Sequence, residues 1–120
     1  MKKKIEKFED LDVWKEAMKL SVDIYKIFSN CKDYSFKDQI QRAAVSIPSN
    51  ISEGYDRSSN KEYIRFLYIA RGSCAELRTQ LYLSLKLNLI ENSLVLDMID
   101  TTKKISAMLF NLIKFRKEKF

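Results

Sequence analysis

Hydrophobic residues recur at intervals of three and four along most of the chain, which is the spacing of one face of an α-helix. This pattern predicts helices over residues 10–28, 36–55, 60–87 and 93–116. Alternation of period two, which would indicate half-buried strands, is nowhere sustained. The faces expected in the core are Trp14, Ala17, Met18, Ser21, Ile24, Tyr25 and Phe28; Phe36, Ile40, Ala43, Ala44, Ile47 and Ile51; Tyr63, Phe66, Leu67, Ala70, Cys74, Leu77, Leu81 and Leu85; and Leu96, Ile99, Ile105, Met108, Leu109 and Leu112.

Polar residues at the expected helix ends predict how the helices begin. Ser35 with Asp38 three residues later forms a loose capping box at the start of the second helix. Asn60 is expected to cap the third helix, because asparagine is a favoured N-cap residue.

The segments between these helices are short, and the chain has only two glycines and one proline. Both features favour a single domain over residues 1–120, an all-α, up-and-down antiparallel four-helix bundle. No apolar run reaches the roughly 18 residues of a membrane span, and MKKKIEKFED lacks the apolar region of a signal peptide. With Cys31 and Cys74 in unrelated contexts, a reducing cytoplasm is the simplest expected location.

The segment RAAVSIPSNISEGYDR places polar groups and a proline inside the second helix. On a helical wheel, Pro48 is expected on the outer side, kinking the helix near Ala44, with Ser46 rebonding the freed backbone. One stripe beside the apolar face holds Gln39, Arg42, Ser46, Asn50, Glu53 and Arg57, and the third helix offers Arg65, Gly72, Ser73, Glu76 and Gln80.

These two stripes admit a structural and a reactive interpretation. We favour a structural network in which Arg42 and Arg65 pair with Glu53 and Glu76, with the amides of Asn50 and Gln80 as bridges. A reactive site built on the carboxylates is the alternative.

Gly72 costs about 1 kcal/mol in mid-helix relative to alanine. That cost predicts the close approach of another backbone, within the subunit or across an oligomer interface.

Residue types missing from the chain argue against catalysis. Histidine is absent, which removes Ser–His and Cys–His pairs and the Glu-x-x-His motif of di-iron bundles. Two cysteines are too few for a cysteine zinc site, and no phosphate-binding glycine motif occurs. We therefore expect no enzyme, no metal and no cofactor. Four aromatic residues at core spacing, namely Tyr25, Tyr63, Phe66 and Phe110, are interpreted as packing rather than as platforms for stacking bases.

The formal charge of +6 comes mostly from residues 61–120, which hold 11 Lys and Arg against 6 Asp and Glu. Such an excess is compatible with nucleic-acid binding, and equally with an ordinary solvated surface. The candidate phosphate contacts are Arg71, Arg78, Lys86, Lys103, Lys104, Lys114, Arg116, Lys117 and Lys119.

Three segments in order, FEDLDVWKEAMKLSVDIY, QIQRAAVSIPSNISEGYDR and EYIRFLYIARGSCAELRTQL, resemble a bacterial family of four-helix-bundle proteins encoded within intervening sequences of large-subunit ribosomal RNA genes. That family includes the accessory variability determinant of diversity-generating retroelements. The resemblance extends from Phe8 to Leu112 and is most specific between Arg42 and Gln80. Its motif residues correspond here to Arg42, Ala43, Ser46, Ile47, Asn50, Ile51, Glu53, Gly54, Arg57, Arg65, Phe66, Ala70, Gly72, Ser73, Glu76, Leu77 and Gln80.

The resemblance implies a barrel-like homopentamer without enzymatic activity. In the retroelement branch it also implies binding of nucleic acid and of a reverse transcriptase through a basic surface. We therefore expect a homo-oligomer that binds RNA or DNA without sequence reading. The alternative is a structural or adaptor oligomer for a protein partner, with Leu87, Leu89, Ile90 and Phe115 as its expected apolar patch.

Overall fold

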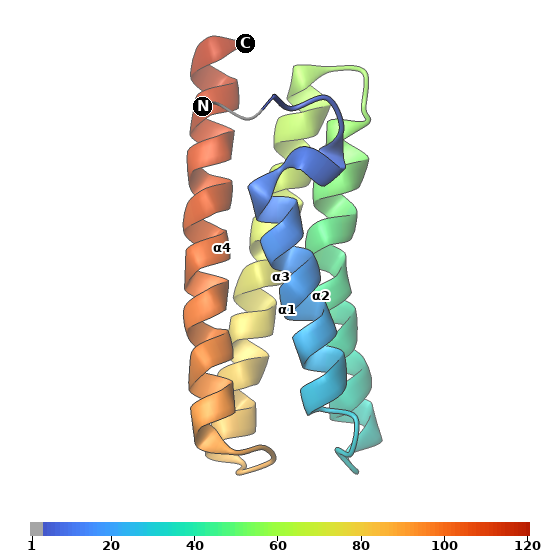
Figure 1. Cartoon of the computed structure of the whole chain (residues 1–120), viewed down its shortest axis with the longest axis vertical. Coiled ribbons are helices and arrows are strands. Elements are labelled where there is room, and N and C mark those ends of the chain that lie inside the picture. The colour runs from blue at the N-terminus through green and yellow to red at the C-terminus, as the bar shows by residue number, and fades with distance from the viewer. Residues whose placement is uncertain (1–3) are drawn as a thin grey trace.

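The computed structural model describes residues 4–120, so the first three residues of the predicted domain lie outside the described part. Within it, a short 3-10 helix (η1, Phe8–Asp10) precedes four α-helices: α1 (Asp12–Ile27), α2 (Tyr34–Tyr55), α3 (Asn60–Lys86) and α4 (Asn92–Lys119). Successive helices run in opposite directions and pack side by side (Figure 1). The predicted all-α bundle is confirmed, with helix bounds within three residues of the predicted ones.

The helix caps differ from the predicted ones by one or two residues. The Asp33 carboxylate, not Ser35, accepts a hydrogen bond from the Phe36 backbone N–H at 3.1 Å. The Ser59 hydroxyl, not Asn60, accepts one from the Glu62 N–H at 3.1 Å. In both cases the capping side chain lies three residues before the N–H that it accepts, the usual N-cap geometry.

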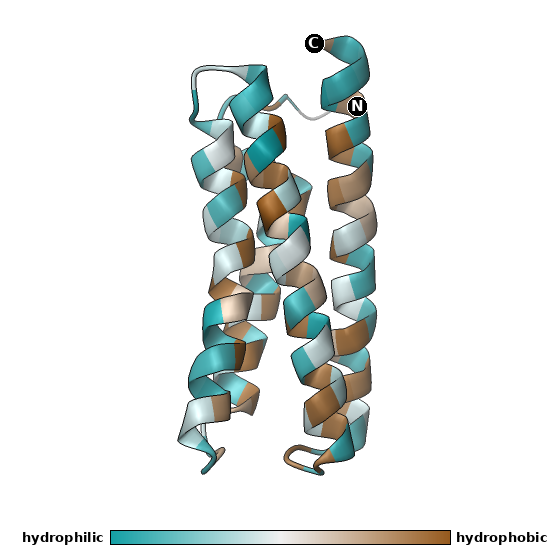
Figure 2. Cartoon of the chain, turned by 180° about the vertical axis from the view of Figure 1, so that it is seen from behind, coloured by the Kyte–Doolittle hydropathy of each residue, from teal (hydrophilic) through white to brown (hydrophobic). Residues whose placement is uncertain are grey.

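Side chains from every helix fill one continuous core. The largest fully buried ones include Leu20, Ile24, Ile40, Ile47, Ile51, Leu67, Leu77, Leu81, Val95, Ile105 and Leu109. Burying each aliphatic side chain of this kind contributes about 1.5–3 kcal/mol. Figure 2 shows hydrophobic positions recurring among hydrophilic ones along the helices that face the viewer, the pattern from which the helices were predicted.

Pro48 is buried, which contradicts its predicted outward position. Proline has no N–H, so the Ala44 carbonyl four residues earlier loses its helical donor. The Ser21 hydroxyl of α1 replaces that donor at 3.0 Å, while also lying 3.0 Å from the Ala17 carbonyl. The predicted rebonding by Ser46 is therefore wrong. The partner comes from the neighbouring helix, and it removes the cost of an unpaired buried carbonyl, about 1–3 kcal/mol.

Several residues predicted to be in the core are exposed instead. Met18 and Tyr25 on α1 and Leu96 on α4 lie at the surface. On the outer side of α1 and α2 lies the apolar groove. It is a hollow of about 590 Å³ lined chiefly by Phe8, Trp14, Met18, Val22, Tyr25, Val45 and Pro48.

Among residues 4–120, none of the helices combines the length and the hydropathy that crossing a bilayer requires.

Candidate nucleic-acid interface

Helices α3 and α4 bring five of the nine candidate cations into one groove. Its first half is a hollow of about 400 Å³ lined by Arg71, Arg78, Lys103, Ser106, Ala107, Phe110 and Asn111. Its second half, about 280 Å³, is lined by Tyr68, Arg71, Phe110, Ile113, Lys114, Lys117 and Glu118. Arg71 and Phe110 line both halves, so the two hollows adjoin. We call this surface the basic groove.

The cations of the basic groove lack carboxylate partners. Among residues 4–120, none of Arg71, Arg78, Lys103, Lys114 and Lys117 forms an ion pair. Glu118 is the one carboxylate among the described residues that line the groove. Unpaired guanidinium and ammonium groups along a concave surface favour a ligand that supplies negative charge, such as a phosphate chain.

Two aromatic rings lie between these cations. The guanidinium carbon of Arg71 is 5.1 Å from the centre of the Phe110 ring, and the Arg71 Nε atom is buried without a hydrogen-bond partner. The Lys117 ammonium donates to the Tyr68 hydroxyl at 2.6 Å and lies 5.0 Å from that ring. Phe110 is 50% exposed and Tyr68 45% exposed.

Phe110 was predicted to pack in the core, and its exposure shows that this prediction is wrong. Tyr68 was not among the residues that the sequence singled out for this surface. A sequence signal existed for Phe110. It directly follows Leu109, which continues the core spacing of Ile105, and neighbouring helical residues point about 100° apart. Leu109 is fully buried, so the ring of Phe110 turns outward.

Four candidate cations lie outside the basic groove. Lys86 ends α3 and Lys119 ends α4, both exposed. Lys104 pairs with Glu16 of α1 at 3.1 Å. Arg116 is held by Asn60 and is only partly exposed. The nine cations predicted to form one nucleic-acid surface therefore fall into five that line the basic groove and four that lie outside it.

Asn60 and Arg116 join the start of α3 to the end of α4. Arg116 Nε donates to Asn60 Oδ1 at 2.7 Å, and Asn60 Nδ2 donates to the Arg116 carbonyl at 3.1 Å. The guanidinium carbon lies 4.9 Å from the Tyr63 ring centre and 3.6 Å from that of Phe120. Burial raises the pKa of Tyr63 to about 12, with the charge of Arg116 opposing the shift. Arg116 therefore has a structural role.

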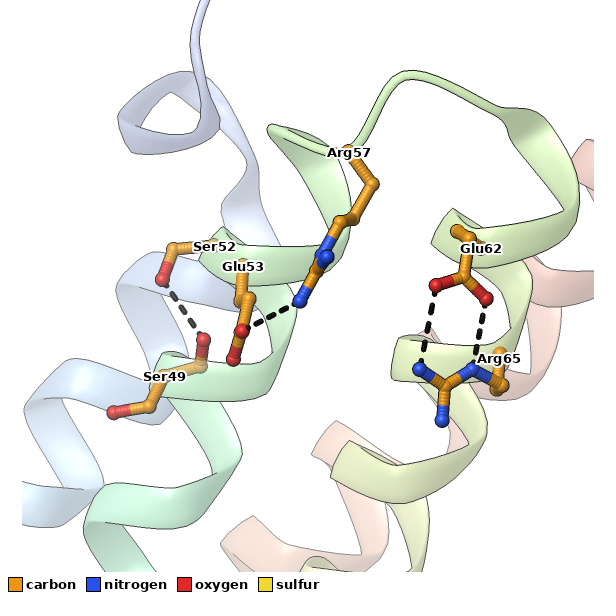
Figure 3. Close-up of polar contacts among 6 residues, drawn as sticks. All are labelled: Ser49, Ser52, Glu53, Arg57, Glu62 and Arg65. Carbon is orange, nitrogen blue, oxygen red and sulfur yellow. Dashed lines mark hydrogen bonds and ion pairs between the residues drawn. The ribbon is translucent and has the colours of Figure 1, made fainter.

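The end of α2 and the start of α3 form the Phe66 cluster, made of Glu53, Arg57, Glu62, Arg65 and Phe66. Arg57, two residues beyond the end of α2, pairs with Glu53 of α2 at 2.9 Å, and Arg65 pairs with Glu62 at 2.8 Å within α3 (Figure 3). Both guanidinium carbons lie 4.8 Å from the centre of the Phe66 ring. The hydrogen bond from Arg65 lowers the pKa of Glu62, and in return Glu62 raises that of Arg65. The predicted pairing across helices is replaced by two local pairs, three or four residues apart in sequence, whose arginines meet on one ring.

Deeper along α2 and α3, part of the predicted polar network is present. The hydroxyls of Ser46 and Ser73 lie 2.8 Å apart, joining the two helices. Asn50 Nδ2 lies 2.7 Å from the Ser46 carbonyl and 3.0 Å from the Ser46 hydroxyl. At Gly54 a Cβ atom would come within 2.6 Å of the Phe66 Cβ. The close helix approach therefore occurs at Gly54.

The remaining motif residues have no such partner. Among residues 4–120 neither Arg42 nor Glu76 forms an ion pair, and Gln80 Oε1 has no hydrogen bond although Gln80 is 7% exposed. With Gln39, Ala43 and Ser46 they line a hollow of about 290 Å³, which we call the polar hollow. A Cβ at the exposed Gly72 would meet nothing within 4 Å, which excludes the predicted close approach within the subunit.

The cysteines show no feature of reactive thiols. Both are free and buried. Cys74 donates to the Thr102 carbonyl at 3.1 Å, and burial raises its pKa to about 11, so the thiol is a poor nucleophile. Within residues 4–120 no three Cys, Asp or Glu side chains gather into a group that could hold a metal ion.

Comparison with known proteins identifies a family and a similar solved structure. Residues 9–111 match the profile of the family described as 23S rRNA-intervening sequence protein. The fold is similar to the crystal structure of a protein of unknown function from the S23 ribosomal protein family of Bacteroides thetaiotaomicron VPI-5482. The TM-score is 0.80 at 25% identity, over 85% of this chain and 98% of that chain. None of the curated proteins is similar enough in sequence to match.

Proposed function

Because the chain belongs to the family of 23S rRNA-intervening sequence proteins, we propose that it is a non-enzymatic, cytoplasmic homo-oligomer that binds RNA or DNA through the basic groove without reading sequence. The observation that supports this most is the set of five cations without carboxylate partners along one concave surface. Contacts to phosphate carry no base information, so such binding is independent of sequence.

Self-association is supported by the side chains that find no partner within the subunit. Arg42 and Glu76 carry opposite charges on the polar hollow, and Gln80 has a buried unpaired oxygen there. The helix cost of Gly72, about 1 kcal/mol, has no compensation inside the subunit. A neighbouring copy that packs on α2 and α3 would supply partners for these three side chains and a reason for the glycine.

The resemblance noted in the sequence favours five copies. A pentamer would multiply the formal charge of +6 by five and would present five basic grooves on one particle. Repeated grooves raise the avidity for a long nucleic acid beyond that of one groove.

The proposal is tested by light scattering and by titration with a structured RNA at several salt concentrations. We expect about five times the 14.2 kDa subunit mass, and an affinity that falls by about 0.7–0.9 log units per phosphate contact for each log unit of salt. The triple variant Arg71→Gln, Arg78→Gln, Lys103→Gln should lower that slope by about two units.

A matched control removes the same charge elsewhere. Lys19, Lys32 and Lys61 are exposed and lie outside the basic groove. Their triple replacement by glutamine should leave the salt slope nearly unchanged. Equal losses in both triple variants would show that net charge alone drives binding, and a monomer that ignores RNA would refute the proposal.

The apolar groove on α1 and α2 favours a second function, an adaptor for a protein partner that docks an apolar helix there, such as a reverse transcriptase. This groove replaces the predicted patch at the helix ends, since Leu89 and Ile90 pack on the core while Leu87 and Phe115 are exposed. Binding that persists at high salt, and that Val22→Glu abolishes, would favour the adaptor.

A further inference from the structure

We propose that the basic groove takes unpaired nucleotides, whose bases stack on Phe110 and Tyr68 while the surrounding cations contact their phosphates. This inference rests on the proposed function and names its ligand. The starting point is that Phe110 is about half exposed and lines both hollows of the groove. The ring lies against the Arg71 guanidinium, and its exposed half is open to a ligand.

The aromatic and cationic groups are interspersed along the groove. Tyr68 and Arg71 are three residues apart on α3, and Lys103, Phe110, Lys114 and Lys117 follow one another along α4. Cations beside aromatic rings are the recurring equipment of surfaces that bind single strands, because every base has a flat face to stack.

A duplex would leave these rings unused. Bases in a helix are stacked on one another, and inserting a side chain between them costs a few kcal/mol per step. Unpaired nucleotides present their faces without that cost. The exposed rings therefore favour loops, bulges and single strands over paired segments.

The dimensions fit a short segment. From Lys103 to Lys117 the helix advances about 21 Å at 1.5 Å per residue, which corresponds to roughly six stacked nucleotides at 3.4 Å each. The larger hollow, about 400 Å³, is within the range of about 300–1000 Å³ common for small-molecule pockets.

The test compares three labelled probes of about twelve nucleotides, twice the groove length. They are an oligouridine strand, an abasic strand with the same phosphates, and a duplex. Fluorescence anisotropy at low salt should show the oligouridine bound about tenfold more tightly than the abasic strand, since stacking one base contributes on the order of 1–3 kcal/mol. An oligothymidine strand, run in parallel, tells whether RNA or DNA is preferred.

Variants assign the effect to the ring. Phe110→Leu should weaken oligouridine binding about tenfold and leave the abasic strand unaffected, while Phe110→Tyr keeps a ring and should bind normally. Tyr34→Leu is the matched control, an aromatic residue that is 69% exposed and lies outside the groove.

The outcomes separate this inference from the proposed function. If Phe110→Leu weakens the abasic and oligouridine strands equally, the ring only supports Arg71, and stacking is refuted while phosphate binding stands. Equal affinity for all three probes, unchanged by Phe110→Leu, likewise refutes stacking and leaves phosphate binding intact. If no probe binds at low salt, both proposals fail.

Discussion

Phe66 and Phe110 each lie under an arginine, and the surroundings of these two rings differ. In the Phe66 cluster, each guanidinium pairs with a carboxylate one turn away, and Phe66 is 7% exposed. In the basic groove, Arg71 lies over a half-exposed Phe110 and has no carboxylate partner. The charge of the arginine on the ring is neutralised by a carboxylate in the Phe66 cluster and is not neutralised in the basic groove. Between these two clusters, pairing with a carboxylate therefore distinguishes the arginines that hold helices together from the arginine available to a ligand.

The strongest test of this comparison is the loss of each ring. Phe66→Ala should lower the free energy of unfolding by about 3 kcal/mol, because it removes buried ring contacts and leaves a cavity. Phe110→Ala should cost less than about 1 kcal/mol, since half of its ring already meets water. Urea unfolding followed by circular dichroism measures both. Similar costs for the two variants would contradict the division into a structural and a ligand-binding ring.

The two glycines extend the comparison from the rings to the backbone, because Gly54 is closely packed and Gly72 is open. Gly54→Ala should cost about 1–3 kcal/mol, because the new Cβ would lie 2.6 Å from the Phe66 Cβ. Gly72→Ala should stabilise the isolated subunit by up to about 1 kcal/mol, since its Cβ meets nothing. Thermal melts measure stability, and light scattering measures assembly. Loss of the oligomer in Gly72→Ala alone would place a neighbouring copy against α3, whereas an unchanged oligomer would remove Gly72 from the interface.

A smaller difference in stability is expected between substitutions of the half-buried Asn50 and of the exposed Glu53 on α2. Asn50→Ala should cost about 1 kcal/mol, because the half-buried amide bonds both the carbonyl and the hydroxyl of Ser46. Glu53→Ala should cost no more than about 0.5 kcal/mol, as expected for an exposed pair one turn apart. Chemical denaturation compares them. If neither variant changes stability or assembly, the structural interpretation of this motif is wrong.

The smallest expected effect is the pH dependence of Glu62. Its pKa in the folded chain lies below its usual value because Arg65 donates hydrogen bonds to it. A lowered folded pKa means that the stabilisation is complete above the unfolded pKa and is lost as the pH falls through the folded one. The stability difference between the parent and Glu62→Gln should therefore shrink below about pH 4.3, the ordinary glutamate pKa. A difference that stays constant to pH 3 would show that the pair contributes nothing through ionisation.

Helix positions were predictable because they depend on local periodicity. Ile40, Ile47 and Ile51 recur at helical spacing, and all three are fully buried. The ends were less predictable, since several polar residues compete to cap within one turn, as Asp33 and Ser35 do.

The candidate site was predictable only in its residue types. A helical wheel places Arg71 and Lys103 on faces of their own helices, but it cannot say which two faces meet. The separation of Lys104 and Arg116 from the basic groove depends on Glu16 and Asn60, which are distant in sequence. The outward turn of Phe110 likewise depends on which side of α4 contacts the core.

Pro48 and Ser21 have an evolutionary consequence. The proline leaves the Ala44 carbonyl without a donor, and the serine on another helix supplies it. A relative that replaces the proline by an ordinary residue restores the backbone donor and no longer needs the hydroxyl. Selection should therefore act on the two positions as a unit, and family members should keep or lose the serine and the proline together. Their pairing across an alignment would mark the contact between α1 and α2 without any structure.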